Sequence, residues 1–148
     1  CVSFELRFAQ IRDLKKVLRA EAIVYGRLPL MITENCLVQN ETGCRLDRQG
    51  PCVPEDGPCR CGQPNVLVDR TGAAFPLLPA YGHRTEIQNS KPLYLAVRPE
   101  HRRLGLAYAR LRFTTETAEE CVSVVQNYLD AAPAAGDFTR GLYERGVE

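Results

Sequence analysis

The sequence predicts an α/β fold, namely a partial (β/α) TIM-like barrel fragment that carries a Cys-rich loop and a small β insertion. Within residues 2–25, a strand pattern, a helix pattern and a second strand pattern follow one another, which is the order of a βαβ unit with a parallel sheet. A further strand pattern and helix pattern occupy residues 106–130. These steps are too few for a closed barrel, which needs about 200 residues or more, so we expect the 148 residues to form a single fragment, the carboxy-terminal portion of a barrel.

The first three expected elements lie close together. Over residues 2–8, apolar and polar side chains alternate at the period of a half-buried strand. Apolar residues then recur at helical spacing between Ile11 and Leu18, with charged residues on the other side of the helix. Glu21–Tyr25 is a short, mostly apolar run that we interpret as the second strand.

The middle of the chain is expected to depart from the barrel. Residues 32–64 form the expected Cys-rich loop, because they are crowded with cysteine, glycine and proline. Residues 65–97 form the expected β insertion, in which turn-forming pairs separate three short strand patterns, at Val66–Val68, Ala74–Leu78 and Leu93–Val97.

The last part of the chain returns to a strand and a helix. A short helix is expected at residues 98–103 and a strand at Leu106–Phe113. Thr117 and Glu120 have the spacing of a capping box, so we expect a helix from there to about residue 130. Its apolar stripe consists of Ala118, Cys121, Val122, Val125, Tyr128 and Leu129. Because it lies on this stripe, Cys121 is expected to be a small buried thiol rather than a metal ligand.

Five of the seven cysteines fall in the Cys-rich loop, namely Cys36, Cys44, Cys52, Cys59 and Cys61. Thiolates gathered on a loop that cannot form regular structure typically share a metal or are bridged to one another. Soft sulfur ligands select zinc or an iron–sulfur cluster. The chain lacks the two C-x₂₋₄-C pairs of most zinc ribbons, and its wider spacing leans toward iron–sulfur. Zinc, disulfides and unreactive thiols stay open as alternatives.

Composition bounds the remaining function classes. The formal net charge is +1 with acids and bases interleaved, so no bulk attraction to nucleic acid or membrane is expected. No run approaches the ~18 apolar residues of a membrane span. The odd number of cysteines and their clustering argue against a secreted disulfide framework and favour the cytoplasm. The chain begins at Cys1, so we expect a piece of a longer protein, with the amino-terminal half-barrel of that protein as its partner.

Several segments together resemble one known family. They are Val24–Met31, Thr33–Cys36, Leu67–Gly72, Phe75–Pro76, Asn89–Leu93, Arg112–Glu116, Phe138–Gly141 and Arg145–Val147. In this order they resemble the collagenase-like peptidase family (peptidase U32 family), in the region that follows its amino-terminal half-barrel. The resemblance covers nearly the whole chain.

The resemblance implies a 4Fe–4S cluster held by Cys36, Cys44, Cys59 and Cys61. Residues 45–58 are longer than in the family pattern and add Cys52, which is therefore an alternate ligand in place of Cys59 or Cys61. Characterised family members take part in oxygen-independent hydroxylation of tRNA, ribosomal RNA or a quinone precursor, and some are linked to prephenate. The resemblance thus implies a part of such a 4Fe–4S-dependent hydroxylation protein. A collagenase-like peptidase and a structural zinc module are the alternatives.

Four arginines in the family-matching segments are candidates for substrate binding: Arg27, Arg70, Arg112 and Arg140. A planar guanidinium group suits carboxylate or phosphate, so we expect contacts with an RNA backbone or a prephenate-like anion. Structural salt bridges and loop caps are an equally weighted alternative for these arginines.

No catalytic residue is assigned from the sequence. His83 and His101 are the two histidines, and neither lies in a recognisable nucleophile or metalloprotease motif. A turn position is the preferred interpretation for His83, because no partner motif accompanies it. Glu34 and Glu116 could serve as acid or base groups, but the sequence does not pair them with another carboxylate.

Overall fold

The computed structural model describes residues 1–14, 19–42, 60 and 63–144 of the chain. The chain divides into two compact units. Unit 1 comprises Cys1–Leu28 together with Lys91–Glu148, and unit 2 comprises the intervening Pro29–Ser90.

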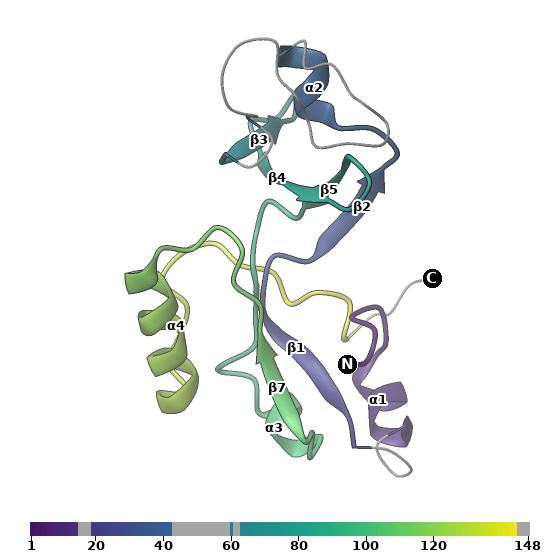
Figure 1. The fold of residues 1–148 in the computed structure, drawn as a ribbon. Coiled ribbons are helices and arrows are strands. Elements are labelled where there is room, and N and C mark those ends of the chain that lie inside the picture. The colour runs from purple at the N-terminus through teal and green to yellow at the C-terminus, as the bar shows by residue number, and fades with distance from the viewer. Residues whose placement is uncertain (15–18, 43–59, 61–62, 145–148) are drawn as a thin grey trace. The chain divides into compact units, whose positions relative to one another are not determined.

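The sheet of unit 1 has the strand order β6–β1–β7, with β1 (Glu21–Gly26) in the centre. β7 (Tyr108–Leu111) runs parallel to β1, as Figure 1 shows, and β6 (Leu93–Tyr94) runs antiparallel to it. The last three residues of β1 are buried in succession. A strand covered on both faces reads as a continuous apolar run, so the strand predicted at Glu21–Tyr25 was recognisable and is confirmed.

Two tyrosines stabilise an irregularity in β1. The register of β1 with β7 shifts after Ile23, and Tyr143 Oη donates a hydrogen bond of 2.6 Å to the Ile23 carbonyl. Tyr128 Oη donates to the next carbonyl, that of Val24. Tyr128 Oη also accepts a 2.8 Å hydrogen bond from Leu95 N–H. Because buried backbone groups need partners, these phenols satisfy groups that the interrupted strand pairing does not.

The helices in the described residues of unit 1 are α1 (Phe8–Leu14), α3 (Pro99–Arg103) and α4 (Ala118–Asp130). The larger buried cluster of this unit consists of Ile11, Val24, Leu28, Leu93, Leu95, Leu104 and Tyr143. A second cluster consists of Tyr25, Tyr94 and Ala96. The core of unit 1 therefore combines residues from both of its stretches of chain.

The helix predicted from the capping box is confirmed as α4. Thr117 Oγ1 accepts a 3.3 Å hydrogen bond from Glu120 N–H, and the Glu120 carboxylate accepts one of 2.8 Å from Thr117 N–H. The apolar stripe of α4 is more exposed than its periodicity suggests, since Val122 is 70 % exposed and Leu129 is 71 % exposed. Cys121, expected to be buried, is half-buried.

Unit 2 contains a four-stranded antiparallel sheet with the order β2–β5–β4–β3. Its strands are β2 (Pro29–Thr33), β3 (Asn65–Val68), β4 (Ala74–Ala80) and β5 (Arg84–Gln88), and α2 (Leu37–Thr42) follows β2. The strand patterns predicted at Val66–Val68 and Ala74–Leu78 are confirmed as β3 and β4. The turn between them is closed by Asp69, whose carboxylate accepts hydrogen bonds from Thr71 and Ala73.

The prediction of a partial barrel was wrong. Within the described residues, the strands form two separate sheets, one mixed and one antiparallel, and the sole parallel pairing between strands is that of β1 with β7. The error began at residues 2–8, which form turns leading into α1 rather than a strand. Their side chains do alternate between exposed and half-buried, and the apolar ones pack on the core. Val2 N–H donates a hydrogen bond to the Glu21 carbonyl of β1, but the segment does not pair with β1 as a strand. The period-2 signal therefore reported burial and not strand pairing.

Two strands of unit 2 were not predicted. The sequence of β5 is mostly polar, yet Thr85, Ile87 and Gln88 are buried. The first three residues of β2 were assigned to no element and the last two to the expected Cys-rich loop, and its three central side chains are all exposed. Neither sequence shows the apolar–polar alternation that identifies a half-buried strand, because β2 exposes apolar side chains and β5 buries polar ones.

Candidate functional site

Cys36 lies between β2 and α2, where the Cys-rich loop begins. Its residue is 5 % exposed and its thiol is free. Cys36 is buried close to the end of β2. The sheet therefore positions its thiol, and not the loop that carries the other cysteines. Cys36 is also the one predicted metal ligand that lies within the described residues, since Cys44, Cys52, Cys59 and Cys61 lie outside them.

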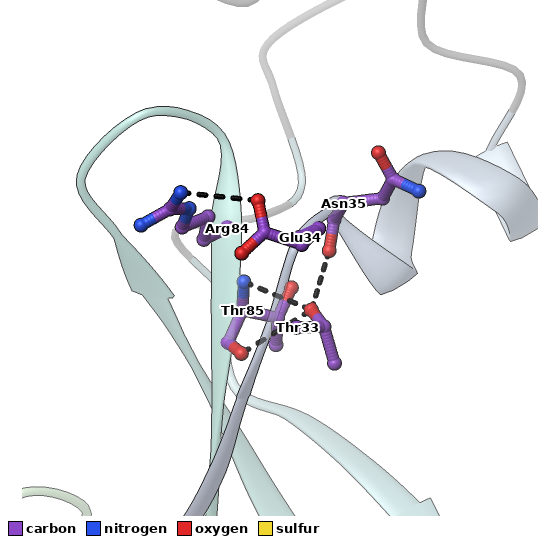
Figure 2. A network of polar contacts seen from close by, with 5 residues as sticks. All are labelled: Thr33, Glu34, Asn35, Arg84 and Thr85. Carbon is purple, nitrogen blue, oxygen red and sulfur yellow. Dashed lines mark hydrogen bonds and ion pairs between the residues drawn. The ribbon is translucent and has the colours of Figure 1, made fainter.

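A polar network fixes the backbone before Cys36 (Figure 2), and a further hydrogen bond fixes it after Cys36. Thr33 Oγ1, at the end of β2, donates to the Asn35 carbonyl at 2.5 Å and also accepts a 3.3 Å hydrogen bond from Thr85 N–H. Thr85 Oγ1, on the neighbouring β5, accepts a 3.0 Å hydrogen bond from Leu37 N–H. Thr85 is 2 % exposed. The residues immediately before and after Cys36 are thus both tied to the sheet.

An ion pair at the surface joins the same two strands. Arg84 Nη2 lies 3.0 Å from Glu34 Oε2, and both side chains are substantially exposed (Figure 2). The pairing gives Glu34 a structural role, because its carboxylate already engages a guanidinium group. An exposed ion pair of this kind contributes roughly 0–1 kcal/mol to the free energy of unfolding. Its main effect is therefore on the orientation of the Glu34 and Arg84 side chains.

The described residues contain no group of three or more His, Cys, Asp or Glu side chains that could hold a metal ion. Of the other described cysteines, Cys1 is exposed and Cys121 is half-buried, and both are free thiols. His83 lies in the turn between β4 and β5 with a φ of 57°, which agrees with the predicted turn position. A metal at Cys36 would therefore need ligands from outside the described part of the chain.

Unit 1 holds a second candidate site, a pocket of about 590 Å³. The side chains with polar or aromatic groups that line it include Tyr25, Arg27, Tyr94, Glu116, Asn127 and Phe138. This volume lies within the range of small-molecule sites, and aromatic walls with a few polar groups are typical of them.

Glu116 is the best-connected polar group of this pocket. Its carboxylate accepts hydrogen bonds from Tyr25 Oη at 3.1 Å and from the N–H groups of Thr114 at 2.7 Å and Thr115 at 3.0 Å. Burial raises the pKa of the Tyr25 phenol well above its ordinary value, and the Glu116 charge and hydrogen bond raise it further. Tyr25 therefore stays protonated at neutral pH and acts as a donor to Glu116.

The other two carboxylates of the pocket also have partners. Glu120 completes the capping box of α4, and Asp137 lies 3.1 Å from Lys91 Nζ. The acidic side chains are thus occupied by donors of the protein itself. The basic side chain among the lining residues is that of Arg27.

Of the four predicted substrate-binding arginines, Arg27, Arg112 and Arg140 belong to unit 1 and Arg70 belongs to unit 2. Arg27 lines the pocket, and Arg112 lies next to it, because Arg112 Nη1 donates a 2.8 Å hydrogen bond to the Arg27 carbonyl. Arg140 is exposed elsewhere in unit 1, and Arg70 is exposed in the β3–β4 turn of unit 2. The sequence named Arg27 and Glu116, but it did not indicate that Tyr25 joins them, since Tyr25 read only as an apolar strand residue.

Comparison with known proteins adds no relative. A scan against protein-family models, a search of curated proteins and a search of solved structures each find no match to this chain. Within the part of the chain that the structure describes, no helix is both long and apolar enough to cross a membrane.

Proposed function

We propose that this chain is part of a peptidase-U32-type protein in which the Cys-rich loop carries a 4Fe–4S cluster and supports oxygen-independent hydroxylation of an anionic acceptor. The observation that carries the proposal is the buried free thiol of Cys36, held between two sheet-bound residues where the loop begins. The ordered sequence segments that resemble the family support the same function.

The chemistry of Cys36 fits a soft metal. Cysteines that bind a cluster are thiolates. Because hydrogen bonds to the sheet already hold the segment around Cys36 in place, the loop does not have to position this first ligand. Cys36 would hold the cluster together with Cys44, Cys59 and Cys61, with Cys52 as the alternate ligand. When bound, such a cluster supplies electron transfer, which no side chain of the chain provides alone. These thiols need a reducing compartment, and the cytoplasm is the one we propose.

The composition of unit 2 also favours a metal. In the described residues, its buried apolar side chains include Cys36, Leu77 and Ile87, while Thr85 and Gln88 are buried polar residues. Small units with little apolar core are typically stabilised by metals or disulfides. A cluster on the Cys-rich loop would add the stabilisation that this sheet does not obtain from apolar packing.

The pocket around Arg27 is the proposed position of the acceptor. Tyr25, Tyr94 and Phe138 offer aromatic surface on which a base or ring can stack. Arg27 offers a guanidinium group to phosphate or carboxylate. An RNA nucleotide or a prephenate-like anion satisfies both requirements.

The cluster is tested by preparing the chain without oxygen and measuring iron, acid-labile sulfide, zinc and absorbance in the blue. We expect iron and sulfide, and we expect Cys36→Ser to lose most of both. Cys121→Ser is the matched control and should retain the cluster, because Cys121 lies on α4 in unit 1. Stoichiometric zinc would instead assign a structural zinc module.

A colourless chain without iron or zinc would end the metal proposal. Peptide hydrolysis that survives replacement of all five loop cysteines by serine would favour the collagenase-like peptidase. The acceptor is tested separately by RNA binding, which Arg27→Gln should weaken by about tenfold through loss of a charge-assisted contact. Arg12→Gln, an exposed arginine of α1, is the control.

A further inference from the structure

Unit 1 contains another pocket, of about 340 Å³, between α3, β7 and α4. Its walls include His101, Arg102, Leu106, Ala109, Leu111 and Leu129, none of which lines the pocket around Arg27. The aliphatic side chains form most of this surface. The polar groups come from His101 and Arg102 of α3 and from Tyr128 of α4.

His101 forms part of the wall of this pocket. The residue is 6 % exposed, and its buried Nδ1 has no hydrogen-bond partner among the described residues. The edge of the imidazole packs against Tyr128, with ring centroids 6.3 Å apart. This Nδ1 nitrogen has an accessible area below 1 Å², so His101 contributes to the wall of the pocket and not a ligand contact through Nδ1.

The pKa of His101 determines whether this side chain adds a positive charge to the pocket. Burial lowers the pKa of the imidazole below its ordinary value, and the nearby Arg102 charge lowers it further, while the Arg98 carbonyl and Glu100 act in the opposite direction. The ring is therefore neutral at neutral pH, with one N–H donor and one acceptor nitrogen.

Arg102 provides the charge of the pocket. One of its guanidinium nitrogens donates a 2.8 Å hydrogen bond to the Tyr128 carbonyl, which orients the side chain at the pocket. A guanidinium group has five N–H donors, and this bond uses one of them. An anion fits beside Arg102, whereas a cationic ligand would be repelled.

The size of the pocket limits the ligand further. At roughly 30 Å³ for each non-hydrogen atom, the share of one water molecule in the liquid, the pocket holds about ten such atoms. We propose that this pocket binds a small apolar carboxylic acid, with its carboxylate at Arg102 and its hydrocarbon part against Leu106, Leu111 and Leu129. This site is independent of the proposed cluster and of its acceptor.

The proposal is tested by titrating the chain with octanoate and following the NMR signals of the residues that line the pocket. We expect saturable shifts confined to those residues. Octanol should bind about tenfold more weakly, because it lacks the charge, and octylamine should cause no saturable shift. Arg102→Gln should weaken octanoate binding by about tenfold, while Arg103→Gln, an exposed neighbour outside the pocket, should leave it unchanged.

Three results would overturn the proposal: no saturable shift with octanoate, octylamine binding as tightly as octanoate, or equal losses in Arg102→Gln and Arg103→Gln. The spectrum of each variant without ligand shows whether it keeps the native fold. If Arg102→Gln does not, the comparison of octanoate, octanol and octylamine on the unmodified chain decides alone.

Discussion

The central strand of unit 1 lies between two strands from the other end of the chain, whereas every strand of the unit 2 sheet comes from one continuous stretch. Unit 1 buries a large apolar cluster around its sheet, while the described part of unit 2 buries polar Thr85 and Gln88 beside Cys36. Unit 1 therefore relies more on apolar packing. Unit 2 depends more on hydrogen bonds around the start of the Cys-rich loop, which is where a metal would contribute most.

The largest expected effect separates two glycines, one from each unit. A Cβ on Gly26, at a φ of 118°, would lie 2.0 Å from the Arg112 carbonyl oxygen, whereas one on Gly72, at a φ of 85°, meets nothing within 4 Å. Gly26→Ala should therefore lower the free energy of unfolding of unit 1 by about 3 kcal/mol or more, through backbone strain and overpacking. Gly72→Ala should lower that of unit 2 by about 1 kcal/mol. Urea denaturation followed by NMR signals from each unit measures both, and equal losses would contradict this account of Gly26.

The next effect concerns the tyrosines behind β1. Tyr128→Phe removes the hydroxyl that bridges Val24 and Leu95, so we expect unit 1 to lose about 2 kcal/mol of unfolding free energy. Tyr81→Phe changes an exposed tyrosine of unit 2 and should alter stability by less than about 0.5 kcal/mol. If both variants unfold at the same urea concentration as the parent chain, the phenol does not support the interrupted strand pairing.

A smaller effect is expected at the network around Cys36. Thr85→Val removes the acceptor of Leu37 N–H, and a buried donor left unpaired costs about 1 kcal/mol. The loss should be confined to unit 2 and should accelerate hydrogen exchange at Leu37. Thr71→Val, in the exposed β3–β4 turn, should leave exchange at Leu37 unchanged. An unaltered Leu37 rate in Thr85→Val would show that the network does not hold the segment.

The two units should also respond to acid in different pH ranges. His101 in unit 1 has a pKa lowered mainly by burial, so the unfolded state binds the proton more tightly and the stability of unit 1 should start to fall below about pH 6.5. Asp69 in unit 2 has a pKa lowered by its hydrogen bond to Thr71 and by the neighbouring backbone N–H groups. Its contribution is present above about pH 4 and is lost below it. Unit-resolved denaturation across this range checks the order, and a loss from unit 2 first would contradict it.

The sequence identified those elements of the fold whose signals are local. The capping box at Thr117, the apolar run of β1 and the turn at Asp69 each stabilise a structure through residues close in the chain. The pairing of β1 with β7 and the position of β5 depend on partners far along the chain, and periodicity carries no information about them. For that reason the alternation at residues 2–8 was interpreted as a strand, although the segment has no partner strand.

The same difference between local and distant residues separates the two candidate sites. Cys36 was predicted as a ligand from the local crowding of cysteines, and the structure adds that its thiol is buried and its neighbours are tied to Thr33 and Thr85. The pocket around Arg27 joins Tyr25 from one end of the chain with Glu116 from the other. No local pattern could bring these residues together, so the sequence listed Arg27 and Glu116 as unrelated candidates.

The most direct measurement compares hydrogen exchange of the chain prepared without oxygen before and after removal of its metal by a chelator. We predict that amides of unit 2, including Leu37 and the residues of β5, lose protection from hydrogen exchange when the metal is removed. Amides of β1 and β7 in unit 1 should keep theirs. A chain that contains no metal as prepared, or one whose unit 2 amides exchange equally slowly with and without it, would contradict the account.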